Sequence, residues 1–184
     1  MYGLPKIGMS EKDLKWMSLK GAARIQAVIS GNAAAGVGID PLSEILERRG
    51  KVRVLENFCK YDTVSAMMIS NPVTLKKHPG LFVNYFKAWL TAHELRKNNL
   101  EKFAKVYTAG LQEIGWKAKY PVILAVIKRV RAVPFITKKV RAYLNDMADK
   151  QVKLGWIKSH PDYLTIKKLN DSALRKAAAE LGLK

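Results

Sequence analysis

Two acidic residues spaced four apart, Asp40 and Glu44, come nearest to a reactive pair in this sequence of 184 residues. Two carboxylates on one helical turn could work as a general acid and a general base. They can also simply stabilise a helix start, Asp40 by capping free N–H groups and Glu44 by its charge. We favour capping, because Pro41 suits the first position of a helix.

Other reactive residue types lack the spacing that catalysis or metal binding requires. His78, His93 and His160 fall in separate segments, and Cys59 is the sole cysteine, so neither a metal-ligand cluster nor a thiolate site is indicated. The Gly36-Val37-Gly38 run lacks the third glycine of a dinucleotide-binding loop. We therefore expect no enzyme activity, no metal and no cofactor.

Positive charge is the compositional feature that most suggests a partner. The chain has 33 Lys and Arg against 15 Asp and Glu, a net charge of +18. Residues 71–184 hold 23 of the basic and 8 of the acidic side chains. The lysines and arginines are spread as singles and pairs, which is typical of a solvated helix face. A basic helical nucleic-acid-binding protein is the alternative function, and we favour it less.

The first 70 residues alternate between strand-like and helix-like patterns. Helical faces are predicted after Gly21 and after Asp40-Pro41, with Gly50 ending the second helix. Alternating or continuous apolar runs predict strands at 14–19, 33–39, 51–55 and 64–70. This order predicts an α/β fold with a mostly parallel sheet in residues 1–70.

After residue 70 the chain is predicted to be predominantly helical. Capping and proline signals predict helices that begin behind Asn71, behind His78 and behind Thr137. Apolar residues at the 3.6-residue period predict further helices from Leu100, behind Pro121 and behind Asn170-Asp171. The helix behind His78 carries a stripe of large side chains that we expect to be buried: Leu81, Phe82, Tyr85, Phe86, Trp89 and Leu90.

Five segments share residue types with one family of binding proteins. They are ARIQAVISG at 23–31, GIDP at 38–41, GKVRVL at 50–55, KKHP at 76–79 and DMADKQVKLGWIK at 146–158. This ordered set resembles the solute-binding proteins of ABC importers, in the branch for nitrate, sulfonates, taurine and the thiamine pyrimidine precursor. The last two segments are similar to that family's return helix and to its penultimate helix and turn.

The resemblance implies a partial type II periplasmic-binding-protein fold that is truncated at its amino end. Residues 1–60 would be the remainder of the second α/β lobe, and residues 61–184 the carboxyl part of the first lobe plus the C-terminal helices. The implied partners are a small-molecule ligand, an ABC permease in the membrane, and either a missing amino-terminal portion or a second copy. The implied location is periplasmic, although no signal sequence is recognisable.

The implied ligand site is the turn Gly38, Ile39, Asp40 and Pro41, together with Asn32. Helix N-termini offer unpaired N–H groups that suit an anion. Asp40 competes for the same donors, so it could instead cap the helix or accept a hydrogen bond from a ligand N–H. Family members usually carry an aspartate where this chain has Ala34. We expect the chain to bind a small anionic or heterocyclic organic solute between two lobes and to present it to a permease.

Overall fold

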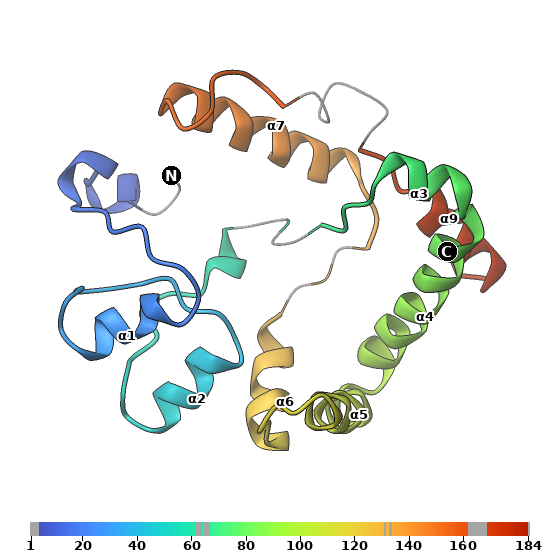
Figure 1. Ribbon diagram of the computed structural model, residues 1–184, viewed down its shortest axis with the longest axis horizontal. Helices are drawn as coiled ribbons and strands as arrows, with labels where there is room; N and C mark the ends of the chain where they lie inside the picture. The colour runs from blue at the N-terminus through green and yellow to red at the C-terminus, as the bar shows by residue number, and fades with distance from the viewer. Residues whose placement is uncertain are drawn as a thin grey trace. The chain divides into compact units, whose positions relative to one another are not determined.

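The computed structural model describes residues 4–61, 64, 67–130, 132, 134–161 and 169–183 (Figure 1). Short 3-10 helices lie at Leu4–Ile7, Glu11–Asp13 and Phe58–Lys60. The α-helices are α1 (Ala23–Ile29), α2 (Leu42–Arg48), α3 (Pro72–Lys77), α4 (Pro79–Asn98), α5 (Leu100–Glu113), α6 (Tyr120–Arg129), α7 (Lys138–Lys153) and α9 (Ser172–Glu180). None of the described residues belongs to a β-strand.

The helices belong to two compact units, each built from two separate stretches of chain. The first unit comprises Met1–Tyr61 and Leu100–Val130, and the second comprises Asp62–Asn99 and Arg131–Lys184. In the first unit α5 packs on α6, and α2 also contacts α6. In the second, α4 packs along α9 and contacts α3. The predicted division of two lobes at residue 60 stays a prediction.

Local capping signals explain where α3 and α7 begin and where α7 ends. Asn71 Oδ1 accepts a hydrogen bond from the Val73 N–H at 2.8 Å, ahead of α3. Thr137 Oγ1 accepts one from the Val140 N–H at 3.2 Å at the start of α7. Gly155, with a φ of 71°, follows the end of α7 in the left-handed region that favours glycine. These predicted starts and stops are confirmed.

Small and branched apolar side chains form the cores. Ala104, Ala118, Ile123 and Ile127 are buried together between α5 and α6. The α4–α9 core consists of Val83, Leu90, Leu174, Ala177 and Ala178, and a further cluster consists of Val140, Leu144 and Leu169.

No helix in the described parts is both long and apolar enough to cross a bilayer.

The prediction that the large side chains of α4 share one buried face is wrong in part. Leu81 is 59% exposed and Tyr85 is exposed as well, whereas Val83 is buried. The contacting partner, α9, presents alanines, of which Ala177 is completely buried. Because α9 spans only Ser172–Glu180, it covers only part of the twenty-residue α4.

The predicted α/β fold with a mostly parallel sheet in residues 1–70 is wrong. Residues 14–19, 33–39 and 51–55 have irregular backbone, and so do residue 64 and residues 67–70; residues 65 and 66 lie outside the described chain. The physical reason is that alternation reports which side chains suit a buried face, whereas a strand exists only when a second segment completes its hydrogen bonds. Among the described residues, no second segment pairs with any of these predicted strands.

Candidate ligand-binding site

The predicted ligand turn lies immediately before α2, in the first unit. The Asp40–Pro41 peptide bond is cis, and the Pro41 carbonyl accepts a hydrogen bond from the Ile45 N–H at 3.0 Å. Gly38 lies tightly against α2, because a Cβ at that position would collide with Ser43 Oγ and lie 3.3 Å from Ser43 Cβ. The turn therefore depends on glycine at position 38.

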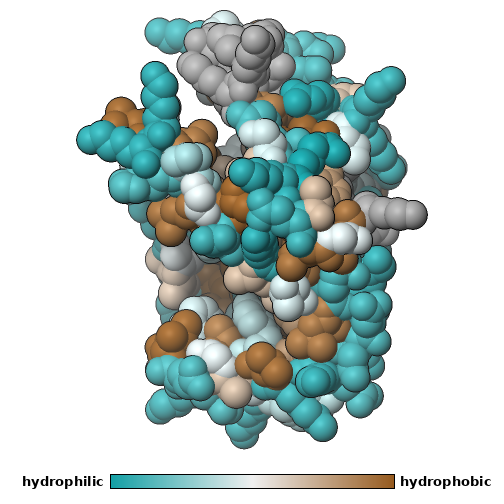
Figure 2. Space-filling view, turned by 90° about the vertical axis from the view of Figure 1, so that its right-hand side faces the viewer, coloured by the Kyte–Doolittle hydropathy of each residue, from teal (hydrophilic) through white to brown (hydrophobic). Residues whose placement is uncertain are grey.

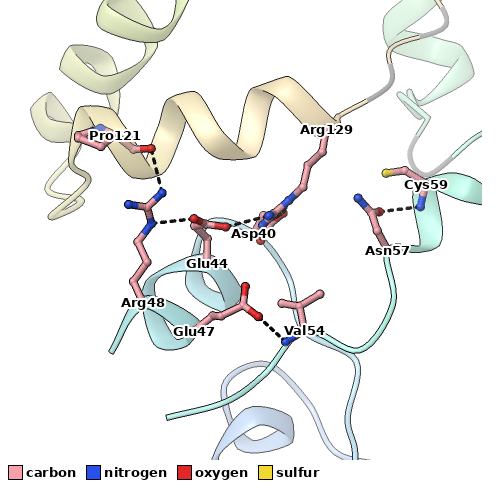
Figure 3. A network of polar contacts seen from close by, with 9 residues as sticks. All are labelled: Asp40, Glu44, Glu47, Arg48, Val54, Asn57, Cys59, Pro121 and Arg129. Carbon is pink, nitrogen blue, oxygen red and sulfur yellow. Dashed lines mark hydrogen bonds and ion pairs between the residues drawn. The ribbon is translucent and has the colours of Figure 1, made fainter. Parts of the chain in front are cut away.

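Asp40 does not cap α2, which corrects the capping prediction. The helix begins at Leu42 and has no side-chain cap. The carboxylate of Asp40 instead accepts hydrogen bonds from two nitrogens of Arg129 at the end of α6 (Figure 3). Nε donates to Oδ2 at 3.1 Å, and Nη2 donates to both Oδ1 and Oδ2 at 2.9 Å. A charged bidentate pair of this kind is stronger and more directional than a neutral cap.

Glu44 joins the same network from inside α2. Arg129 Nη1 donates to Glu44 Oε2 at 2.8 Å, and Arg48 Nε donates to Glu44 Oε1 at 2.7 Å (Figure 3). Arg48 also reaches the Pro121 carbonyl at 3.5 Å. The Glu44 side chain is only 9% exposed, so both of its oxygens need partners. The two arginines supply them and tie α2 to α6.

The network shifts the pKa values of Glu44 and Arg129 in opposite directions. Hydrogen bonding from Arg48, the largest effect, lowers the pKa of Glu44; Arg129 adds to the lowering, while burial opposes it. Burial by itself would lower the pKa of Arg129, but its hydrogen bonds with Asp40 and Glu44 raise that pKa above the ordinary value. Glu44 and Arg129 are therefore held in their charged forms.

Two guanidinium groups and two carboxylates leave the cluster with no net formal charge. An anionic ligand would have to compete with Asp40 for Arg129. At the start of the short helix α2 it would also meet the negative charge of Glu44, which lies in the first turn. A ligand that donates N–H groups has an easier approach, because the Asp40 side chain stays 28% exposed and a carboxylate has about four acceptor positions. Among the expected ligand classes, the geometry favours an amino-substituted heterocycle.

The remaining predicted site residues do not join this network. Asn32 lies in the loop after α1, where its Nδ2 donates to Ser30 Oγ at 3.0 Å. Ile39 is 60% exposed, and its carbonyl accepts the Ser43 N–H at 3.3 Å. Gly38 and Pro41 shape the turn through their backbone. Of the five predicted residues, Asp40 is thus the one whose side chain takes part in a charged cluster.

Sequence reasoning missed Arg129 and Arg48. Arg48 could have been found, because it follows Glu44 by four residues, the spacing of a helical ion pair. Arg129 lies 89 residues from Asp40, and no local pattern indicates such a partner. Asp40 lies before α2 and Glu44 lies inside it, and Arg129 pairs with both carboxylates.

Other chemistry-bearing groups are dispersed. No three His, Cys, Asp or Glu residues gather in a metal-binding arrangement within the described ranges. His93 stacks on Trp89 with ring centres 5.4 Å apart, and burial lowers the pKa of this histidine. His160 Nε2 lies 2.6 Å from Asp149 Oδ1. His93 and His160 therefore have different neighbours, a stacked ring and a carboxylate.

Comparison with known proteins returned no relative: no protein-family model, no curated protein and no solved structure matches this sequence.

Proposed function

We propose that this chain is a solute-binding component of an ABC importer, and that it takes a small heterocyclic organic solute and delivers it to a membrane permease. The observation that carries the proposal is the order of its helices. The segments that resemble the family's return helix and its penultimate helix and turn coincide with α4 at Pro79–Asn98 and with α7 and the turn at Gly155. The parallel sheet is no part of the proposal.

The contact we assign to the solute is the Asp40 carboxylate. Arg129 fixes its orientation through two nitrogens, so the remaining acceptor positions have a defined direction. An exocyclic amino group on a heteroaromatic ring would donate to this charged acceptor, which makes a stronger hydrogen bond than a neutral one. Such binding needs no covalent step; a solute of this kind acts by stabilising one conformation over another.

The experiment is isothermal titration of the purified chain with an amino-substituted pyrimidine, taurine, an alkanesulfonate and nitrate. The proposal expects heat from the aminopyrimidine, and the loss of most of it in Asp40→Asn. Asp13→Asn is the matched control, because Asp13 is an exposed carboxylate of the same unit that only caps a 3-10 helix through Ser10. A folded sample that gives heat with none of the four compounds contradicts the proposal.

A second candidate function, nucleic-acid binding, is favoured by the exposed aromatic and basic side chains of one surface stretch of the first unit, residues 105–119. Tyr107 and Trp116 are exposed on α5 and on the turn after it, and Lys105, Lys117 and Lys119 are exposed in the same stretch. Aromatic faces that stack bases and lysines that neutralise phosphates are the two components of sequence-tolerant single-strand binding. The net charge of +18 adds long-range attraction for a polyanion.

This alternative is tested by titrating a fluorescent single-stranded oligonucleotide at several salt concentrations. If the surface binds, changing Lys105, Lys117 and Lys119 to Gln lowers the slope of log affinity against log salt by about 2, at about 0.7 per phosphate contact. Lys12, Lys15 and Lys20, which are also exposed in the first unit, serve as the control triple. Equal salt slopes in the two triple variants would exclude this surface as the nucleic-acid-binding site.

A further inference from the structure

Large apolar side chains are exposed in the segments that have strand-like sequence and irregular backbone. Ile39 is 60% exposed, Leu55 is 67% exposed and Ile69 is 92% exposed. Figure 2 shows one face of the surface, on which apolar side chains lie uncovered among hydrophilic ones. Exposed apolar residues occur singly in most proteins, but here they recur in stretches that also lack regular backbone pairing.

Residues 51–55 offer the clearest set of unpaired backbone groups. The Lys51 N–H donates to the Leu46 carbonyl at 3.0 Å, and the Val54 N–H donates to Glu47 Oε1 at 2.7 Å. The N–H and carbonyl groups of Arg53 and Leu55 have no hydrogen-bond partner among the described residues. In a strand, residues 51, 53 and 55 would present their backbone groups along one edge. On that edge the backbone groups of Arg53 and Leu55 are open, while the Lys51 N–H is already bonded to Leu46. The opposite edge is occupied at Val54.

The side chains of this segment alternate in a way that suits pairing. Val52 and Val54 are β-branched and favour a pleated backbone. Lys51 and Arg53 alternate with them and are exposed, so any strand laid beside the segment would face two positive charges. Opposite charges directly across a pair of strands stabilise it, and like charges destabilise it.

We propose that Lys51–Leu55 is a docking segment that pairs with an acidic, extended polypeptide by β-strand addition, along the edge formed by residues 51, 53 and 55. Main-chain hydrogen bonds to Arg53 and Leu55 would supply affinity, and carboxylates opposite Lys51 and Arg53 would supply specificity. A second copy of this chain is a poor occupant, because it would bring the same two cations and a further charge of +18. The inference does not depend on the proposed solute-binding function.

The test uses a fluorescent peptide of alternating Glu and Val, titrated with the full chain and followed by fluorescence anisotropy and by infrared absorption of the amide groups. We expect saturable binding, a new β-sheet signal and weakening by salt. Arg53→Pro removes one free N–H without breaking a described hydrogen bond, and should weaken binding at least tenfold. The matched control is Ser18→Pro, an exposed position in irregular backbone of the same unit, which should bind normally.

Three outcomes would overturn the inference. Equal affinity for a Lys-Val peptide would remove the charge argument. Unchanged binding in Arg53→Pro, with the variant still folded by circular dichroism, would exclude pairing along this edge. A dimer seen by analytical ultracentrifugation, and lost in Arg53→Pro, would assign the edge to a second copy. Failure of solute titration would leave all three measurements interpretable, because none of them uses the solute.

Discussion

Arg129 holds Asp40 through two nitrogens of its guanidinium, although 89 residues separate them in the sequence. The pair joins the end of α6 to the turn before α2, and the third nitrogen of Arg129 contacts Glu44 inside α2. A turn that local sequence would leave exposed is thereby fixed against a helix from a distant part of the chain. The cluster gives the first unit a polar link beside its apolar α5–α6 core.

Removing Arg129 should destabilise the first unit. In Arg129→Ala, the nearly buried Glu44 loses one of its two partners and Asp40 loses a bidentate one. Breaking a buried pair costs roughly 3–5 kcal/mol, but Arg129 is 30% exposed, and screening by solvent reduces the expected loss to about 1–3 kcal/mol. The free energy of unfolding in urea, followed by tryptophan fluorescence, measures it. Arg53→Ala, an exposed arginine in the same unit, should change stability by less than about 0.5 kcal/mol, and an equal loss in both variants would argue against the network.

The pKa of Glu44 predicts the direction of the acid response. Its folded-state pKa is lowered from 4.5, so the stability it contributes is fully present above pH 4.5 and is lost as the pH falls through the folded value. Glu44→Gln should therefore be less stable than the parent chain near pH 7, and should lose less of its stability on acidification below pH 4.5. Chemical denaturation at a series of pH values between 7 and 3 measures both. Parallel curves for the two proteins would show that Glu44 is not held in its charged form.

Helices were predictable from this sequence and the absence of a sheet was not. The caps at Asn71 and Thr137 and the stop at Gly155 act within a few residues, so their effect can be determined from sequence alone. The segment 51–55 has the same alternation that a strand would have. Whether it forms a strand depends on whether another segment pairs with it, and such pairing depends on contacts between residues distant in the sequence.

The candidate site shows the same division between local and distant information. The turn at Asp40-Pro41 was predictable because aspartate and proline are typical of a helix start. The use of Asp40 was not, because a capping hydrogen bond is worth about 1 kcal/mol and a charged bidentate partner outcompetes it. That partner, Arg129, was indistinguishable by local pattern from the other basic residues of the chain.

Gly38 should not tolerate a larger residue. In Gly38→Ala the new Cβ meets Ser43, and we expect a loss of about 1–3 kcal/mol from overpacking. Ser43 Oγ is buried and has no hydrogen-bond partner among the described residues, so Ser43→Ala alone should cost little. The double variant Gly38→Ala with Ser43→Ala should recover part of the loss, as measured by thermal unfolding. Additive losses in the double variant would rule out this contact as the cause.

The second unit offers a matched pair of leucines on one helix. Leu90 is 2% exposed in the α4–α9 core, whereas Leu81 is 59% exposed on the same helix. Leu90→Ala should cost about 2–5 kcal/mol through lost burial and a cavity, while Leu81→Ala should cost less than about 1 kcal/mol. Urea denaturation of the two variants tests the packing of α4 on α9, and a reversed order of stability would contradict it.

The most direct test of the proposed function compares three proteins in one titration with an amino-substituted pyrimidine: the parent chain, Asp40→Asn and Arg129→Lys. The parent should bind, and Asp40→Asn should lose at least tenfold in affinity. Arg129→Lys should lose less affinity, because the Asp40 carboxylate remains and is only held less firmly in its orientation. Circular dichroism establishes that each protein is folded. Absence of binding by the folded parent, or equal affinity in all three, would contradict the assignment of Asp40 as the solute contact.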